Sequence, residues 1–357
     1  MAIRIQRDHA LAPLTTLEVG GSADVYVRAE TEGQVVEAIW YAQRAGLALT
    51  VLGGGSNSLV ADAGVRGVVL QPAVMGRRVR AEGDAAVVEV GAGVPWDELV
   101  AWSVSAGLCG LEALSGIPGW VGAAPMQNIG AYGQEVADVV DAVRVVRRDR
   151  GDATWLAADQ LDFSYRMSAF KGRWRDRFVI TAVRFRLRRG APDAPRYREL
   201  MRAVGEGVDH PQVIRDAVLS LRRSKSMVLD DADPNRRSAG SFFLNPILSP
   251  VDFERLKGRL SDHGLDPATL PVWSEGSHHK VPAAWLIERA GFQKGFEYGR
   301  AALSSRHCLA LINPGSATAR DLIELAEHVQ VQVALQWGVD LEPEPVLVGF
   351  AKGLDGV

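Results

Sequence analysis

The hydrophobic positions in the first third of the chain alternate between short apolar runs and stretches with helical spacing. The apolar run over 23–27 is typical of a strand, and Thr31 followed by Gln34 forms a capping-box pattern for a helix that Gly46 can end. A second apolar run, over 47–52, predicts another strand. It leads straight into Gly53-Gly54-Gly55-Ser56-Asn57-Ser58, a turn in which several backbone N–H groups can point the same way.

From about Val68 onward the pattern becomes richer in strands. Alternation of apolar and polar side chains is clearest over 178–187, where it has the period of a strand with one buried face. Pro95 and Gly107 delimit one helix, and the breaker cluster over 190–195 predicts a loop. The other elements expected in this region are strands over 86–90 and 139–146 and a helix over 211–223.

The last third has the mixed pattern of an α+β domain. A short helix is expected over 280–291, and Thr318 caps a longer amphipathic helix. A final strand is expected near Leu341. These changes in pattern place domain boundaries near 70 and 220. The expected segments are 1–70, 71–220 with an excursion loop near 190–200, 221–340, and a terminal strand segment over 341–357.

Composition and charge are those of a globular protein. The 357 residues are 47% hydrophobic and 23% charged, and the formal net charge of -3 gives no reason to expect nucleic-acid binding. With only two cysteines, Cys109 and Cys308, the chain offers neither a disulfide framework nor a cysteine-rich metal site. The arginine pairs are typical of solvated surface but could bind anions locally; they are Arg147-Arg148, Arg188-Arg189 and Arg222-Arg223.

The lengths of the apolar runs indicate where the protein is expected to be located. None approaches the ~20 residues that span a bilayer, and charges interrupt the N-terminal positions where a signal peptide would be apolar. We predict a cytoplasmic monomer that acts on small molecules, without a membrane or nucleic-acid partner. His278-His279 has no further ligand at metal-binding spacing, so a polar loop is the better interpretation and no metal is expected.

Ser241 is the most informative single side chain. It stands between Gly240, which permits unusual backbone angles, and two bulky aromatics, Phe242 and Phe243. Such surroundings hold a hydroxyl in a dry, fixed position, where it needs a partner. The same residues also fit a Gly-Ser turn that enters an apolar strand. The residues alone leave both interpretations open.

Two glycine-rich loops, 53–58 and 115–130, could hold a ligand through backbone amides. Neither carries the Lys-Ser/Thr of a P-loop or the G-x-G-x-x-G fingerprint of a dinucleotide-binding turn, which disfavours simple nucleotide hydrolysis. A ligand large enough to need both loops, such as FAD, fits the pattern. Its side-chain partners would be Ser56, Asn57, Ser115, Gln127 and Asn128. Taken singly, each loop also fits an ordinary tight turn.

Seven separated segments occur together in the order typical of one enzyme family. The chain resembles the UDP-N-acetylenolpyruvoylglucosamine reductases (MurB type) from about position 15 to 349. The resemblance implies an α+β fold in which two subdomains of the vanillyl-alcohol-oxidase type bind FAD non-covalently and a third domain binds a sugar nucleotide. The segments are 52–57, 116–119 with 127–133, 163–171, 222–225, 239–246, 280–287 and 341–344.

The resemblance also implies a reaction in two halves. NADPH reduces the flavin, and UDP-N-acetylglucosamine enolpyruvate then takes a hydride at C3 and a proton at C2, which yields UDP-N-acetylmuramate for peptidoglycan. Arg166 matches the cation beside the substrate carboxylate, Ser241 the proton donor and Glu344 the glutamate near the reacting carbon. Glu342, two positions earlier, would share a strand face with Glu344, but the family pattern favours the later residue.

Binding residues follow from the same resemblance. The residues assigned to FAD are Gly53, Gly54, Gly55, Ser56, Asn57, Ser58, Ser115, Gly116, Ile117, Pro118, Gly119, Gly122, Ala123, Gln127, Asn128, Gly130 and Arg222. The residues assigned to the substrate are Tyr165, Tyr197, Lys225, Asn245, Trp273, Lys280 and His307, of which Trp273 and His307 also fit ordinary core or rim positions. The segment around Tyr197 resembles a loop that, in one subclass of the family, carries a tyrosine over the substrate, and we assign the chain to that subclass.

Three positions depart from the family pattern: Met167, Leu244 and Pro345. Because Pro345 cannot donate to a sheet, the final strand is expected at an edge or after this residue. Two other functions stay open. An FAD oxidase of the same fold would be reoxidised rapidly by air, and a sugar-nucleotide-binding protein that had lost the flavin would be colourless.

Overall fold

The computed structural model describes residues 2–350, which divide into two compact units. Unit 1 comprises the N-terminal segment up to His9, Ser22–Gly55 and Val65–Leu229, and unit 2 comprises Ala10–Gly21, Ser56–Gly64 and the chain from Asp230 onward. Two pieces of the predicted segment 1–70 thus belong to unit 2. The predicted division of unit 1 into two FAD-binding subdomains stays a prediction, and residues 351–357 of the predicted terminal segment lie outside the described residues.

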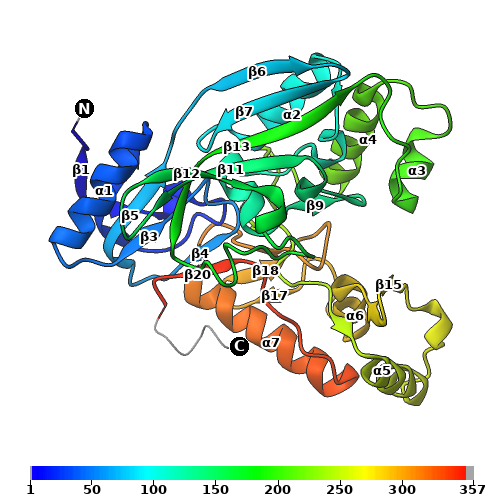
Figure 1. Ribbon diagram of the computed structural model, residues 1–357. Helices are drawn as coiled ribbons and strands as arrows, with labels where there is room; N and C mark the ends of the chain where they lie inside the picture. Colours follow the sequence, from blue (N-terminus) through cyan, green and yellow to red (C-terminus); the bar gives the residue numbers. More distant parts are fainter. Residues whose placement is uncertain (1, 351–357) are drawn as a thin grey trace. The chain divides into compact units, whose positions relative to one another are not determined.

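Unit 1 begins with a four-stranded sheet of order β1-β2-β5-β3, on which α1 packs (Figure 1). The side chain of Thr31 accepts a hydrogen bond from Gln34 N at 3.2 Å, which confirms the predicted start of α1. Val35 and Ile39 of α1 are buried against Val68 and Leu70. The elements are β1 Ile5–Ala10, β2 Ser22–Ala29, α1 Glu32–Arg44, β3 Leu49–Val51 and β5 Val65–Pro72.

A second, six-stranded sheet supplies the larger core of unit 1. Its main path is β12-β11-β13-β7-β6, with β8 paired to β13, and every pairing is antiparallel. The helix α2 buries Trp96 against this sheet, where the indole meets Phe185 edge to face. The elements are β6 Arg77–Glu82, β7 Ala85–Gly91, α2 Trp96–Ser105, β8 Leu108–Cys109, β11 Val140–Arg147, β12 Ala153–Ala157 and β13 Phe178–Arg189.

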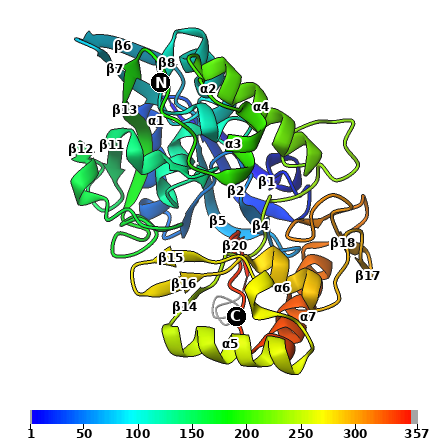
Figure 2. The same cartoon turned by 90° about the vertical axis from the view of Figure 1, so that its right-hand side faces the viewer.

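The remaining part of unit 1 contains two helices that lie side by side, α3 and α4 (Figure 2). Their contact buries Leu200, Ile214 and Val218. The region near 190–200, predicted as an excursion loop, therefore ends in a short helix. The elements are α3 Arg198–Val204, α4 Pro211–Ser224, β9 Gly130–Ala131, β10 Gln134–Glu135 and the 3-10 helices Glu112–Leu114, Val121–Met126, Val136–Asp138 and Ala158–Gln160.

Unit 2 has its own core, built on the long helix α7. Thr318 and Asp321 form a capping box at its start, and Gly338 ends it in the left-handed conformation. Phe242 and Phe243 are fully buried in this core together with Trp337. The elements are β4 Ser58–Val60, β14 Ile247–Leu248, α5 Pro250–Asp262, β15 Trp273–Glu275, β16 His278–Lys280, α6 Ala283–Arg289, β17 Glu297–Tyr298, β18 Ala301–Leu303, β19 Leu311–Ile312, α7 Ala319–Trp337, β20 Val346–Val348 and the 3-10 helices Ala12–Leu14 and Pro267–Thr269.

Two predicted elements of unit 2 start later than expected. The helix predicted from position 280 begins at Ala283, because Lys280 belongs to β16 and Pro282 stands just before the first helical turn. The final strand begins at Val346, directly after Pro345, and pairs in parallel with β4. This position confirms the expectation that the strand would lie at an edge or after the proline. No helix in the described part of the chain is long and apolar enough to cross a membrane.

Candidate functional site

The two glycine-rich loops meet in unit 1. A Cβ atom on Gly54 would lie 2.9 Å from Cδ1 of Trp120 and 3.0 Å from Cα of Gly119, and one on Gly53 would lie 3.4 Å from Cβ of Ala123. Backbones approach this closely only where side chains are absent. The two loops, which were predicted to share one ligand, thus lie in contact with each other. Ser56, Asn57 and Ser58, which complete the first loop, belong to unit 2.

The second loop runs between two 3-10 helices, with Ser115, Gly116, Ile117, Pro118 and Gly119 in the connection. Side chains of this loop stabilise its conformation through hydrogen bonds to neighbouring residues. The hydroxyl of Ser115 is buried and donates to Glu112 O at 2.6 Å. The amide of Asn128 is also buried and donates to Oε2 of Glu135 and to Ser164 O, at 2.6 and 3.1 Å. Contacts of Ser115 and Asn128 with a ligand would thus involve their backbone groups.

Asp97, which the sequence analysis did not single out, anchors the second loop. Its Oδ1 accepts a hydrogen bond from Gly116 N at 2.6 Å, and its carboxylate accepts two from Arg215 of α4, at 2.7 and 2.8 Å. Burial alone would raise the pKa of Asp97, but the bonds from Arg215 and Gly116 outweigh it and lower the pKa. The only signal in the sequence was an acidic residue in the first turn of a helix, a common pattern that indicates no function.

We expect Asp97→Asn to destabilise unit 1 and to loosen the Gly116 loop. Loss of the charge-assisted bonds should lower the free energy of unfolding at neutral pH by about 1.5–3 kcal/mol. Because the pKa of Asp97 is lowered from its ordinary value of 3.8, its contribution is present above that pH and disappears as the pH falls further.

Urea unfolding at neutral pH and at progressively lower pH would measure this. The wild type and the variant should converge in acid. Asp216→Asn, which alters an exposed carboxylate of α4, is the matched control and should stay close to wild type. A constant difference between Asp97→Asn and wild type at all pH values would contradict the assignment.

Arg222 supplies an independent indication that a ligand belongs at this loop. Its Nε is buried without a hydrogen-bond partner among the described residues, whereas Nη2 donates to Met227 O at 2.7 Å. A Cβ on Gly116 would lie 3.4 Å from that Nε, so the two are neighbours. Burial lowers the pKa of the guanidinium. Buried polar atoms are rarely left unpaired in complete structures, so an acceptor on a bound molecule is indicated.

Arg166 stands at the other end of the second loop. It occupies the corner of a tight turn closed by the Ser164 and Met167 backbones, with a φ of 52°. Its Nη2 donates to Gly130 O at 2.7 Å, and its guanidinium lies 5.2 Å from the ring centre of Tyr165. A non-glycine residue with positive φ is uncommon and costs free energy, which is typical of functional positions.

Two residues predicted for the substrate in unit 1 also lie together. Tyr197 packs edge to face on Tyr132 at 5.7 Å between ring centres, and Lys225 places Nζ 5.9 Å from the centre of the Tyr132 ring. Burial raises the pKa of Tyr132 to about 12, so this phenol stays neutral at ordinary pH.

In unit 2 the segments of Ser241 and Glu344 are joined through their backbones. Glu344 N donates to Phe242 O at 2.8 Å, and Leu244 N donates to Glu342 O at 2.9 Å, which makes an antiparallel bridge. Asn57 joins the same structure, because its Nδ2 donates to Glu344 O at 3.3 Å. Three residues predicted from distant parts of the sequence, Asn57, Ser241 and Glu344, are thus brought to adjacent backbone positions.

Among the other predicted residues of unit 2, Trp273 and Lys280 lie together. Trp273 of β15 is the register partner of Lys280 of β16, and Lys280 forms an ion pair with Glu275. Asn245 accepts a hydrogen bond from Ala283 N at 3.0 Å, at the start of α6. His307 lies in a separate turn, where its carbonyl accepts from Ala310 N. In the described part of the chain, no group of three or more His, Cys, Asp or Glu side chains could hold a metal ion.

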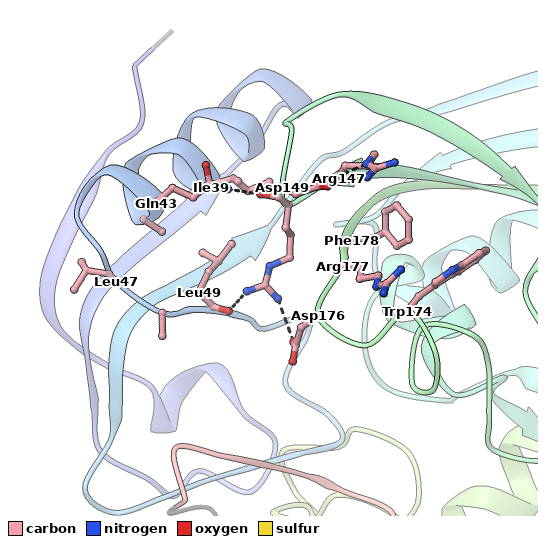
Figure 3. A pocket seen from close by; sticks show the side chains of 13 residues that line it. Ile39, Gln43, Leu47, Leu49, Arg147, Asp149, Trp174, Asp176, Arg177 and Phe178 are labelled. Atoms are coloured by element: carbon pink, nitrogen blue, oxygen red, sulfur yellow. Dashed lines mark hydrogen bonds and ion pairs between the residues drawn. The ribbon is translucent and has the colours of Figure 1, made fainter.

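A pocket of about 820 Å³ lies elsewhere in unit 1, between α1, β3 and the segment 174–178 (Figure 3). None of the predicted site residues lines it. Its arginines are matched by carboxylates: Arg147 bonds Asp149 through two nitrogens, and Arg148 bonds Asp176 at 3.1 Å. Arg147 and Arg148 therefore pair with carboxylates of the protein itself at this pocket.

Comparison with known proteins gives concordant matches over both units. A family model described as "UDP-N-acetylenolpyruvoylglucosamine reductase, C-terminal domain" matches residues 233–348, and one described as "FAD binding domain" matches residues 23–157. The chain is 46% identical over 355 residues to the UDP-N-acetylenolpyruvoylglucosamine reductase of Thermobifida fusca (strain YX), with 98% of this chain and 99% of the relative covered.

Two further comparisons agree. The reductase of the same name from Nocardia farcinica (strain IFM 10152) is 45% identical over 345 residues, with 95% of this chain and 88% of the relative covered. The crystal structure of UDP-N-acetylenolpyruvylglucosamine reductase from Thermus caldophilus superposes with a TM-score of 0.66 at 28% identity, with 97% of this chain and 99% of the other covered.

Proposed function

This chain belongs to the UDP-N-acetylenolpyruvoylglucosamine reductase family, and we propose that it reduces UDP-N-acetylglucosamine enolpyruvate to UDP-N-acetylmuramate with NADPH as the hydride source. The family resemblance and the α+β fold class expected from the sequence are confirmed, and the chain is an FAD-binding oxidoreductase of peptidoglycan precursor synthesis. The observation that carries the proposal is the backbone pairing of the Ser241 segment with the Glu344 segment.

The residues present in unit 1 fit FAD. The close approach of Gly54 to Gly119 and Trp120 brings the backbones of the two loops together, and the unpaired Nε of Arg222 beside Gly116 offers a donor to an anion. We propose that these two loops, with Gly122, Gln127 and the other residues assigned above, hold the cofactor non-covalently. When bound, FAD would carry the hydride from NADPH to the substrate.

The chain's own residues have three proposed tasks. Arg166 binds the substrate carboxylate and stabilises the negative charge that develops on the conjugated enolate. Ser241, which precedes the buried Phe242 and Phe243 in the chain, donates a proton to C2. Glu344 orients the proton network near the reacting carbon. Lys225, Lys280, Asn245 and the aromatic residues Tyr165, Tyr197 and Trp273, with His307, are proposed to bind the sugar nucleotide.

A visible absorbance spectrum of the purified protein tests the proposal directly. NADPH should bleach the flavin bands under anaerobic conditions, and UDP-N-acetylglucosamine enolpyruvate should restore them. Rapid recovery in air without this substrate would favour an oxidase. Protein that is colourless and takes up no FAD would favour a binding protein. Sedimentation tests the predicted monomer, and the cytoplasmic location is proposed because NADPH and UDP-sugars are cytoplasmic metabolites.

Gly54→Ala is expected to weaken FAD binding roughly 5- to 150-fold. The new methyl group would meet Trp120 at 2.9 Å and Gly119 at 3.0 Å, and overpacking of this kind costs about 1–3 kcal/mol. Gly54 does not have a positive φ, so the effect would come from crowding of the two loops alone.

Fluorescence titration of the apoprotein with FAD measures the affinity. The matched control is Gly33→Ala in α1, where a Cβ meets nothing closer than 3.9 Å. Equal affinities of the Gly54 variant and wild type would show that the contact between the loops is not part of the FAD site.

A further inference from the structure

Lys225 is already engaged by an acidic side chain of its own unit. Its Nζ lies 2.6 Å from Oε2 of Glu199, and both side chains are only partly exposed. Lys225 follows directly on the last residue of α4, and Glu199 lies in the first turn of α3, so the ion pair joins the two helices. The cation proposed to hold the diphosphate of the substrate thus has an internal carboxylate in contact with it.

Tyr197 is coupled to this ion pair through the chain. It is the residue that immediately precedes α3, two positions before Glu199, and its ring rests on Tyr132. Leu200 of α3 is buried in the same cluster against Ile214 and Val218 of α4. The position of Tyr197 is therefore set by the docking of α3, to which the Glu199–Lys225 pair contributes.

A diphosphate and the Glu199 carboxylate cannot both occupy Lys225 without repulsion. Each phosphate group of a nucleoside diphosphate carries negative charge, and like charges within a few ångströms destabilise one another. The guanidinium of Arg222 is directed instead toward Met227 O and the Gly116 loop, so it offers no second cation to Glu199. A phosphate placed on Lys225 would consequently compete with Glu199 for the same ammonium group.

We propose that Glu199 is an internal competitor for the diphosphate, which holds α3 and Tyr197 docked in the free protein and is displaced when a nucleoside diphosphate binds. The inference rests on the proposed function, since it takes Lys225 as a phosphate-binding residue. As a consequence, the protein discriminates between ligands, because a ligand without the diphosphate cannot release α3 and Tyr197. Glu199 therefore acts as a specificity-determining residue that does not itself bind the ligand.

Calorimetric titration of the FAD-loaded protein with UDP and with uridine tests this. Partly exposed ion pairs of this kind are weak, so Glu199→Gln should tighten UDP binding about three- to fivefold. It should leave the affinity for uridine unchanged. In steady-state kinetics the KM for the sugar-nucleotide substrate should fall while kcat stays within twofold. The matched control is Glu206→Gln, an exposed glutamate beyond α3, which should change neither affinity.

Lys225→Gln separates failure of this inference from failure of the proposed function. If Lys225→Gln weakens UDP binding but Glu199→Gln leaves it unchanged or weakens it, Glu199 is no competitor and the inference is overturned alone. If Lys225→Gln has no effect on UDP, the phosphate role of Lys225 fails and the inference fails with it.

Hydrogen exchange of Arg198–Val204 gives a second readout that needs no activity. These amides should lose protection when UDP is added to the wild type, and they should be less protected in free Glu199→Gln than in free wild type. Unchanged protection in both cases would contradict displacement of α3 and overturn the proposal.

Discussion

Replacement of Ser241 by alanine should slow product formation about 10²- to 10⁴-fold while NADPH still reduces the flavin at the wild-type rate. A positioned proton donor contributes about 10²- to 10⁴-fold, and the loss should appear in the half-reaction that consumes the enolpyruvyl substrate. The substitution removes only the hydroxyl, because the neighbouring backbone is held independently. Phe242 N donates to Leu309 O and Phe242 O accepts from Glu344 N, both at 2.8 Å.

Stopped-flow spectroscopy of the two half-reactions measures this effect. Ser261→Ala changes an exposed serine of α5 in the same unit and should behave as wild type. Near-wild-type turnover of Ser241→Ala would show that the proton comes from another group. Equal loss in both half-reactions would indicate damage to the fold, which thermal unfolding would reveal.

Arg166→Lys should lower kcat/KM for the enolpyruvyl substrate about 10²- to 10³-fold. Lysine keeps the charge but lacks the planar fork that can bind a carboxylate while also donating to Gly130 O. Removal of one donor that stabilises a developing negative charge has an effect of this size. Arg166→Gln, which also removes the charge, should be slower again, and flavin reduction by NADPH should be unaffected in both variants.

The comparison with Arg175→Gln provides the control, because Arg175 is exposed and lies in the same region of the chain. A graded series from arginine to lysine to glutamine would support a role for charge at the carboxylate. If lysine restored full activity, the guanidinium geometry would be irrelevant. If both Arg166 variants lost FAD while Arg175→Gln kept it, the bonds from Arg166 to the second loop would be structural.

Local chemistry was sufficient to predict several elements. Thr31 and Thr318 predicted helix starts correctly. Each side-chain oxygen accepts a hydrogen bond from the backbone N–H three residues later, so the signal is local. Pro345 limited the final strand for an equally local reason, the missing N–H. The helix expected from position 280 was wrong at its start, because pairing of β16 with β14 and β15 overrides the helical preference of the residues.

The candidate site shows the same contrast between local sequence signals and contacts that depend on the fold. The glycine loops, Ser241 and Glu344 could be proposed as site residues from the sequence because their residue types and order are distinctive. Asp97 could not, since its role depends on Gly116 and Arg215 reaching it from other segments. The Glu199–Lys225 pair was equally hidden, because the two residues lie 26 positions apart and meet only when α3 docks on α4.

The sequence by itself determined the family, the identities of the groups available for chemistry and the elements whose signals are local. Only the tertiary structure decided which of those groups meet: Gly54 with Gly119, Asn57 with Glu344, and Lys225 with Glu199. The physical reason is that a cap or a proline acts over a few bonds, whereas burial, ion pairing and close backbone approach depend on segments far apart in the chain. Whether a charge is free for a ligand is therefore a property of the fold.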